Sequence, residues 1–276
     1  RPCARAFSQA LDRPIQALAA GLHTDAFFGG GGGDSMFCLT HSAFPLIDRL
    51  AAEGLGKGVL ETAGDIAQLT RTNIWKVLAT AARRWPRSHS AMPPPMTNGF
   101  LAPHVREALP WPEGNPWLAS PAGIPPGKRK HVWSIIGIQN QLEGYGREAV
   151  APFLSPLMSQ PIAEVCIAIP SWYWCAGGNN RTVAREAFRD RLPASVIDRR
   201  TKVSFSSLAY RMIRANMAIL RDMLLNGSLT RQGLLDRDRI IAFLGGTMAD
   251  PEALPELMAL VEVEAWVRHW EGRSLR

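Results

Sequence analysis

Five consecutive glycines stand between a short apolar stretch and a segment with helical periodicity, and an aspartate follows them directly. The segment reads FFGGGGGDSMFCL, residues 27–39. A strand, a glycine-rich turn and a helix start can present backbone N–H groups to an anion. The GxGxxG pattern would need a glycine in place of the aspartate, and the Walker pattern would need Gly-Lys before Ser or Thr. The glycines match neither of these phosphate loops: they are Gly29, Gly30, Gly31, Gly32 and Gly33.

The aspartate after the glycines, Asp34, has two candidate roles. A carboxylate repels phosphate directly, but it becomes useful when Mg²⁺ lies between the two, because hard cations bridge carboxylate and phosphate oxygens. The alternative is a helix N-cap, a role that aspartate fills well. Five glycines in a row are hard to justify by capping alone. The pattern therefore favours a Mg²⁺-dependent phosphate site with Asp34 as a metal ligand.

A second group of candidate residues lies in GGNNRTVAREAFRDRLPASVIDRRTK, residues 177–202. Arg181, Arg185 and Arg189 have the i, i+4, i+8 spacing of one helix face. A cation in the first turn opposes the helix dipole, so Arg181 needs a reason to be there. The fork of a guanidinium suits phosphate oxygens. The alternative is ion pairing with neighbouring or distant carboxylates.

The histidines and cysteines indicate no further catalytic or metal site. His104 and His131 have no Ser/His/Asp or His/His spacing around them, so we expect both to be structural. The cysteines lie far apart, without a CxxC pair or zinc-type spacing. They are expected to be buried thiols in a reducing compartment: Cys3, Cys38, Cys166 and Cys175.

Size and composition favour a folded protein of the cytoplasm. The 276 residues, 46% of them hydrophobic, can supply a sizeable core. No apolar run is long enough to span a bilayer, and the first residues lack the apolar core of a signal peptide. We therefore expect no membrane partner. The chain also opens without Met in what looks like the middle of a helix, which suggests a fragment or a truncated protein.

The net charge of +7 is concentrated in one segment. Residues 181–214 hold nine Lys or Arg against three Asp or Glu, a local excess of +6. Few aromatic residues are interleaved to stack on bases. The cluster suits a small polyanion such as a nucleotide phosphate at least as well as a duplex, and a solvated helix face is the alternative. Nucleic acid is not the expected partner.

Helical periodicity covers most of the chain, and a strand is expected only at residues 26–28, directly before the glycines. Between Trp85 and Gly127 lie 11 of the 21 prolines. Residues 86–127 are therefore expected to form an extended, proline-rich loop or insertion. A glycine-rich phosphate loop next to a single strand would be explained if the other strands of its sheet lay upstream of residue 1. Helices are expected over residues 4–20, 35–44, 45–54, 62–84, 128–143, 160–169, 180–191, 204–226, 236–244 and 251–271.

Read together, three blocks resemble the C-terminal synthetase domain of the asparagine synthetases, which belongs to the ATP-pyrophosphatase superfamily. Residues 29–37 stand for the family's Ser-Gly-Glu-Gly-(Ala/Gly)-Asp-Glu-Leu-Phe, and residues 156–170 for its Pro-Phe-Leu-Asp block. Residues 181–188, 192–193 and 200–202 follow its Lys-x-x-Leu-Arg-x-x-Phe, Leu-Pro and Arg-x-Lys. The resemblance implies an α/β, Rossmann-like fold, of which residues 1–276 would be a predominantly helical part with few parallel strands.

The chemistry that the resemblance implies is activation of a carboxylate by ATP and Mg²⁺ as an acyl-adenylate, release of pyrophosphate, and attack by an amine to form an amide. Asp34 matches the Mg²⁺-binding aspartate, and the five glycines match the loop near nucleotide and substrate. Arg181 stands in place of the catalytic lysine that stabilises the adenylation transition state. The other expected nucleotide-binding cations are Arg185, Arg200 and Lys202.

Departures from the family pattern point away from aspartate as substrate. Gly31 replaces the glutamate that helps to hold a small amino acid, and it would leave room for something larger. Ser35 replaces the second acid, and Met158-Ser159 replace Leu-Asp. The pattern looks closer to the asparagine synthetase-like proteins of peptide gene clusters, including lasso-peptide cyclases. Those proteins adenylate a side-chain carboxylate of a precursor peptide and close a macrolactam.

Two parts of the family pattern are missing from these residues: the pyrophosphate loop Ser-Gly-Gly-x-Asp-Ser and a glutaminase domain with its leading cysteine. The chain is therefore expected to be inactive alone and to need an upstream domain or partner protein. The alternative is a truncated, non-catalytic homologue that acts as a binding or scaffold protein.

Overall fold

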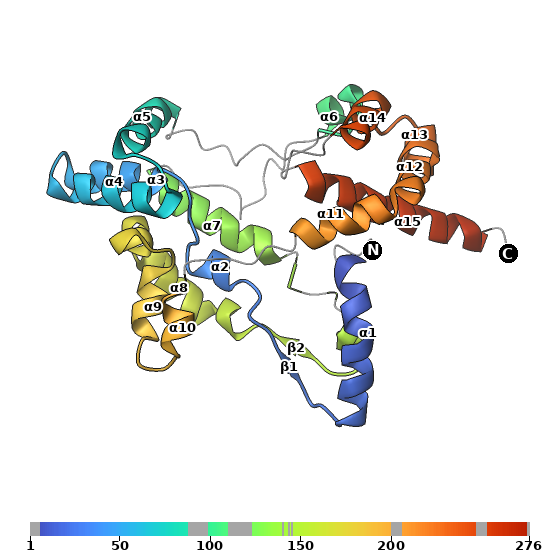
Figure 1. Ribbon diagram of the computed structural model, residues 1–276, viewed down its shortest axis with the longest axis horizontal. Coiled ribbons are helices and arrows are strands. Elements are labelled where there is room, and N and C mark those ends of the chain that lie inside the picture. Colours follow the sequence, from blue (N-terminus) through green and yellow to red (C-terminus); the bar gives the residue numbers. More distant parts are fainter. Residues whose placement is uncertain are drawn as a thin grey trace.

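The computed structural model of the protein describes residues 6–87, 99–109, 123–139, 141–142, 144, 146–199, 206–246 and 253–274. Most of these residues are helical, and two short parallel strands form the sheet of the described part (Figure 1). The expectation of a mainly helical chain with few parallel strands is confirmed. Within the described ranges, no helix is long and apolar enough to cross a membrane.

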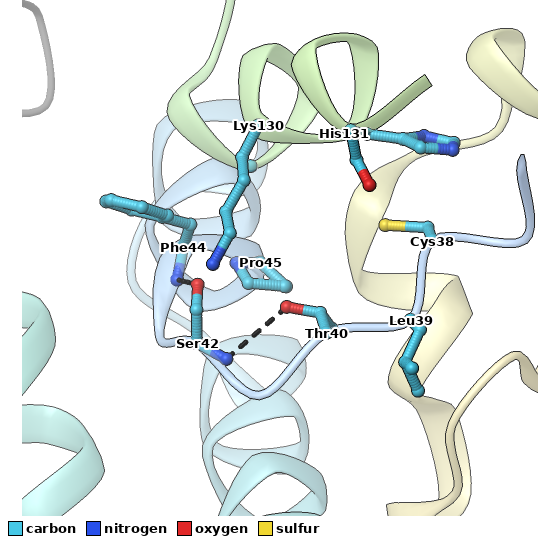
Figure 2. Close-up of a pocket in the computed structure, with 10 residues that line it drawn as sticks. Cys38, Leu39, Thr40, Ser42, Phe44, Pro45, Lys130 and His131 are labelled. Atoms are coloured by element: carbon cyan, nitrogen blue, oxygen red, sulfur yellow. Dashed lines mark hydrogen bonds between the residues drawn. The ribbon is translucent and has the colours of Figure 1, made fainter. Parts of the chain in front are cut away.

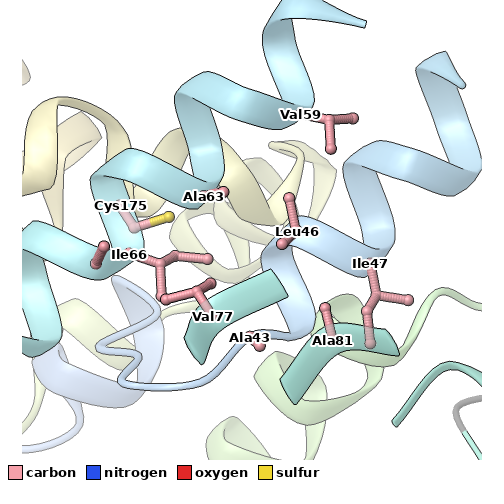
Figure 3. Close-up of a cluster of buried hydrophobic side chains, with 10 residues drawn as sticks. Ala43, Leu46, Ile47, Val59, Ala63, Ile66, Val77, Ala81 and Cys175 are labelled. Carbon is pink, nitrogen blue, oxygen red and sulfur yellow. The ribbon is translucent and has the colours of Figure 1, made fainter. Parts of the chain in front are cut away.

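Three helices of the first half pack around one apolar core, which Cys175 joins from a 3₁₀ segment later in the chain (Figure 3). Leu46 and Ile47 from α3 meet Ala63 and Ile66 from α4, and Val77 of α5 closes the cluster. The elements concerned are α3 (Phe44–Glu53), α4 (Lys57–Thr70), α5 (Ile74–Arg84), α7 (Pro126–Gln139) and the 3₁₀ segment η4 (Ser171–Gly178), with η1 (Trp85–Arg87) after α5.

A buried carboxylate joins three of these elements. Asp48 of α3 accepts hydrogen bonds from the backbone N–H groups of Gly127 (2.8 Å) and Lys128 (2.9 Å), at the start of α7. The Ser171 hydroxyl donates to it at 2.5 Å. Burial raises the pKa of Asp48, although these hydrogen bonds oppose the shift. Because a carboxylate complements the positive end of a helix dipole, Asp48 fixes α7 and η4 against α3.

The single long helix expected over residues 62–84 is wrong, because the chain breaks into α4 and α5. Arg71 takes the left-handed conformation at φ 52° and ends α4. Asn73 then caps α5, its side-chain oxygen accepting from the Lys76 N–H at 2.8 Å. The first helix expected after the glycines also shortens to one turn, α2 (Gly33–Met36). At the start of α5, the Asn73 cap thus begins a new helix although the apolar spacing continues across the break.

The strand expected before the glycines is confirmed as β1 (Phe27–Phe28). It pairs in parallel with β2 (Phe153–Leu154), with Phe27 opposite Phe153. Parallel sheets are normally covered on both faces, yet Phe28 is 73% exposed. Arg147 supports the other side, since its guanidinium lies 5.9 Å from the Phe27 ring centre and 5.6 Å from that of Phe153.

Helix α1 (Ala6–Gly21) is tied to the strand pair by a buried ion pair. Asp12, 2% exposed, accepts from Arg147 Nε at 2.8 Å and from the Gly146 N–H at 2.9 Å in η2 (Gly146–Ala149). The same Arg147 that faces both strand phenylalanines therefore holds the helix. The expected helix over 4–20 is confirmed over the residues described, and it continues through Pro14.

Short helical elements follow the second strand in the sequence. The helix expected at 160–169 forms, with Pro161 in its first turn, but it is only partly buried, since Val165 is 63% exposed. These elements are η3 (Pro156–Met158), α8 (Gln160–Ala168), α9 (Thr182–Ala187) and α10 (Ala194–Ile197).

The last part of the chain forms a second helical group with its own core, around Leu224, Ile240 and Leu257. The single helix expected over 204–226 is broken at Asn216, whose side chain donates back to the Met212 carbonyl at 2.8 Å. The helices are α11 (Ser206–Ala215), α12 (Met217–Asn226), α13 (Ser228–Arg231), α14 (Arg237–Gly245) and α15 (Ala253–Ser274).

The proline-rich segment, expected to be extended, holds a short helix in its described part. Helix α6 (Pro103–Ala108) follows an antiparallel bridge between Leu101 and Leu235, and it lies beside α14 (Figure 1). The Phe100 N–H donates to Glu256 at 2.7 Å. The Phe100 ring is buried in the second core. Residues 99–108 are therefore anchored on the C-terminal helices, and the rest of the segment between Arg87 and Gly123 lies outside the described residues.

Candidate functional site

The glycine run turns the chain from β1 into α2 while passing very close to neighbouring side chains. A Cβ added at Gly29 would lie 2.2 Å from the Phe153 ring, and one at Gly33 would lie 2.9 Å from Leu157. At Gly32 a Cβ would lie 2.0 Å from the Met158 sulfur, and φ is +81°. Larger residues at these positions would displace the side chains of β2 and η3. Close packing thus accounts for three of the five glycines.

Gly30 and Gly31, the other two glycines, differ in how much space lies beside their Cα atoms. Nothing lies within 4 Å of a Cβ added at Gly30, whereas one at Gly31 would meet a Leu142 methyl group at 3.2 Å. The room that the sequence suggested at Gly31 is therefore bounded by Leu142 and, at 3.6 Å, by the Ser155 hydroxyl. Among the residues that the structure describes, the open approach to the backbone of this run lies at Gly30.

Asp34 does not cap the helix that follows the glycines. Gly32 is the N-cap of α2, with no side-chain cap, and Asp34 lies inside the first turn. Its carboxylate instead accepts a hydrogen bond from Arg181 Nη1 at 2.5 Å. The two side chains are 35% and 31% exposed. Two residues that the sequence singled out separately, 147 positions apart, thus meet in a partly open ion pair.

Arg181 lies just outside α9, and not in its first turn as expected from the sequence. It is the N-cap of the helix, in the left-handed region at φ 55°. At the N-cap a cation still faces the positive end of the helix dipole, and the contact with Asp34 opposes this repulsion. Its Nε donates to the Asn180 side chain at 3.1 Å, which leaves Nη1 directed at Asp34. A non-glycine residue in this conformation is uncommon, and such outliers gather at functional sites.

Arg185 has a different environment from Arg181. Its guanidinium donates to the carbonyls of Asn180 (2.8 Å), Ile197 and Arg199 (2.8 Å), and to the Asn180 side chain at 3.1 Å. These contacts tie the start of α9 to the end of α10. The nucleotide-binding role expected for Arg185 remains a prediction, and it would require some of these bonds to open. Arg189 lies beyond the end of α9 and pairs with Glu186.

The turn before Arg181 is held by α4. Asp65 accepts hydrogen bonds from the N–H groups of Gly177 and Gly178, and burial raises its pKa despite them. Both glycines have φ of +67°. The Thr182 hydroxyl donates back to the Ala176 carbonyl at 2.8 Å. Beside this turn lies a cavity of about 120 Å³, lined by Gln68, Leu69, Arg71, Gly178, Asn179, Asn180 and Arg185.

A serine pair links the Asp34 segment to α7. The Ser134 hydroxyl donates to the Ser35 hydroxyl at 3.0 Å. Next to it His131, 2% exposed, has its Nε2 2.9 Å from the Met36 carbonyl oxygen, and burial lowers its pKa. His131 thus has the structural role expected of it. Ser134 could not be identified from spacing, since its partner Ser35 lies 99 positions away in the sequence.

The remaining expectations concern basic residues, cysteines and metal. Arg200 and Lys202 lie outside the described residues, as does Cys3. The other three cysteines are free and buried, and burial raises the pKa of Cys38 and Cys175 to about 12. Over the ranges that the structure describes, no three His, Cys, Asp or Glu side chains come together as a metal cage.

The Pro-Phe-Leu-Asp block of the family pattern fits residues 152–155 better than residues 156–170. Residues 152–155 read Pro-Phe-Leu-Ser, three of the four letters of the Pro-Phe-Leu-Asp block that was assigned to 156–170. These residues form β2 and lie beside the glycine run, since the Gly29 N–H donates to the Leu154 carbonyl at 2.9 Å. The literal tripeptide was the signal that could have found them.

Comparison with known protein families finds a match over part of the chain. A model of the asparagine synthase family matches residues 152–268, which start at Pro152 and include Arg181 but not Asp34. No curated protein and no solved structure matches the chain. Members of the family are ATP-dependent amide-forming ligases, and the match implies an ATP-pyrophosphatase fold. Residues 152–268 are therefore similar to the asparagine synthase family.

Proposed function

We propose that the chain is part of an ATP-dependent ligase that activates a carboxylate as an acyl-adenylate and transfers the acyl group to an amine. The observation that carries this proposal is the ion pair between Asp34 and Arg181. The resemblance assigned the first to Mg²⁺ and the second to the adenylation transition state, on separate motifs. Their meeting in space is what one active site requires.

Asp34 fits a Mg²⁺ ion that is held mainly by phosphate oxygens and water. Mg²⁺ commonly takes only one or two protein carboxylates and fills its other positions with substrate phosphates and water molecules. One partly exposed carboxylate on a short helix next to a glycine turn suits that mode. Magnesium and ATP would supply charge neutralisation and a pyrophosphate leaving group. Asp34 would then leave Arg181 for the cation.

Arg181 would serve as the fixed cation of the site. Its Nε is held by Asn180, so the guanidinium keeps its orientation after Asp34 turns to the metal. A guanidinium stays protonated throughout, so it can stabilise developing negative charge but cannot act as a proton donor as a lysine can. This predicts a purely electrostatic role for Arg181 in adenylation.

The acyl substrate would be an aspartate or a side-chain carboxylate of a precursor peptide. Support for the larger substrate comes from the open approach at Gly30, next to position 31, where the family carries glutamate and this chain has glycine. A peptide substrate would give a macrolactam if its own N-terminal amine attacked. Upstream residues or a partner protein would supply the pyrophosphate loop.

Product analysis by ³¹P NMR tests the reaction type. We expect the full-length protein that contains this chain, given ATP, Mg²⁺ and an acidic peptide or aspartate, to form AMP and pyrophosphate in equal amounts. Formation of ADP and phosphate would contradict adenylation. No consumption of ATP with any of these carboxylates would favour the non-catalytic scaffold instead.

A further inference from the structure

A second group of cations lies apart from Asp34 and Arg181, around the ring of Phe44. The Arg84 guanidinium carbon lies 5.3 Å from the ring centre, and Lys130 Nζ lies 5.9 Å from it. Arg84 comes from the end of α5 and Lys130 from α7, so two separate helices direct positive charge at one side chain of α3. Cation–π contact holds both groups near the ring.

Neither cation has an anionic partner among the described residues. Lys128 and Arg83, close by in sequence, donate to carbonyls: Lys128 to Ile167 and Ile169, and Arg83 to Ala79 at 3.2 Å. Lys130 and Arg84 make no such bond within those ranges. Desolvation of its amine and then the charge of Arg84 lower the pKa of Lys130, although the side chain as a whole reaches solvent. Two like charges held together without a carboxylate are unfavourable unless an anion joins them.

The amine of Lys130 lies at a cavity of about 40 Å³ whose wall includes the turn before α3 (Figure 2). Figure 2 shows the Lys130 side chain running from α7 toward Ser42 and Thr40. The Ser42 oxygen accepts the Phe44 N–H at 3.1 Å, and the Thr40 oxygen accepts the Ser42 N–H at 3.3 Å. With their oxygens engaged in this way, both hydroxyl groups still have a proton to donate.

We propose that Lys130, Arg84 and the hydroxyl groups of Ser42 and Thr40 bind a phosphate group at this cavity. Lys130 and the two hydroxyl groups line the cavity, whereas Arg84 lies at the ring of Phe44, another lining residue, and would reach the anion from there. Charge-assisted hydrogen bonds are the strong ones. The volume admits a group the size of a few water molecules and not a whole nucleotide. The phosphate is therefore either the free ion or the end of a ligand that extends into solvent. This site does not depend on the ligase function.

The test is calorimetric titration of the chain with inorganic phosphate at constant ionic strength set by chloride. We expect saturable binding that weakens about tenfold in Lys130→Gln and in Arg84→Gln, the loss of one charged hydrogen bond. Lys57→Gln is the matched control, because Lys57 is 92% exposed and pairs with Glu61 on its own helix. Its phosphate affinity should equal that of the wild type.

Three further results bear on the assignment. Tighter binding of pyrophosphate than of phosphate, weakened by the same two substitutions, would support the end of a larger ligand, and equal binding would support the free ion. Acetate that binds as tightly as phosphate would overturn the assignment to phosphate. An affinity for phosphate that is unchanged in both variants, or no saturable binding by the wild type, would overturn the site.

Discussion

At the scale of residues, the most informative contact is the 2.5 Å bond between Asp34 and Arg181. Sequence patterns named both residues but could not join them, because each lies in a turn whose path depends on distant partners. The path of Asp34 depends on the Met158 and Phe153 side chains, and that of Arg181 on Asp65, which holds the turn before it. The residue types therefore predicted the candidate roles of Asp34 and Arg181, but they did not predict that the two side chains are in contact.

The glycine turn allows a direct test of its packing. Gly32→Ala places a Cβ 2.0 Å from the Met158 sulfur at φ +81°, so we expect it to lower the free energy of unfolding by about 2 kcal/mol. Gly30→Ala is the control, since nothing lies within 4 Å of its Cβ. Urea denaturation of both variants measures the difference. Equal stabilities would show that the turn is looser than described.

At the scale of elements, helix existence was largely predictable and helix breaks were not. The helices at 160–168 and 237–245 follow their apolar periodicity. The breaks at Arg71 and Asn216 fall within continuous periodicity and are made by left-handed backbone or a side-chain hydrogen bond. Asn73 was a readable cap signal for the first break. The pairing of β1 with β2 was not foreseen, because it joins segments more than 120 residues apart.

The attachment of α1 is expected to rest on the buried ion pair between Asp12 and Arg147. Asp12→Ala would leave the Arg147 charge only 18% exposed and without this carboxylate, so we expect a loss of about 3 kcal/mol in the free energy of unfolding. Asp25→Ala, at an exposed position, should change it by less than about 0.5 kcal/mol. Chemical denaturation of both variants checks this, and matching losses would contradict it.

At the scale of the whole molecule, the described residues hold separate apolar cores. One lies among α3, α4 and α5, and another lies among α12, α14 and α15 with residues 99–108. In the second group, buried Glu264 of α15 accepts the Ser228 and Leu229 N–H groups at 2.9 and 3.0 Å. Burial alone would raise the pKa of Glu264, but these bonds and the one from Arg268 keep it below its usual value. Each group therefore has internal contacts of its own.

Because the two cores are separate, we expect a substitution that destabilises one core to have little effect on the local stability of the other. Leu257 is fully buried in the second core, so Leu257→Ala should cost about 3 kcal/mol there. Hydrogen exchange should quicken in α12, α14, α15 and residues 99–108 and stay unchanged in α3 and α4. Ile219→Ala, 59% exposed in α12, is the control. Equal acceleration throughout the chain would show one cooperative unit.

The central claim, that Asp34 and Arg181 belong to one adenylating site, is tested most directly by carboxylate-dependent exchange of [³²P]pyrophosphate into ATP. The full-length protein should lose exchange by at least about 100-fold in Asp34→Ala and in Arg181→Ala, since each substitution removes a charge that the proposed site would place near the reacting phosphates. Arg189→Ala, which breaks only an exposed pair with Glu186, should retain it. Undiminished exchange in both Asp34→Ala and Arg181→Ala would contradict the account.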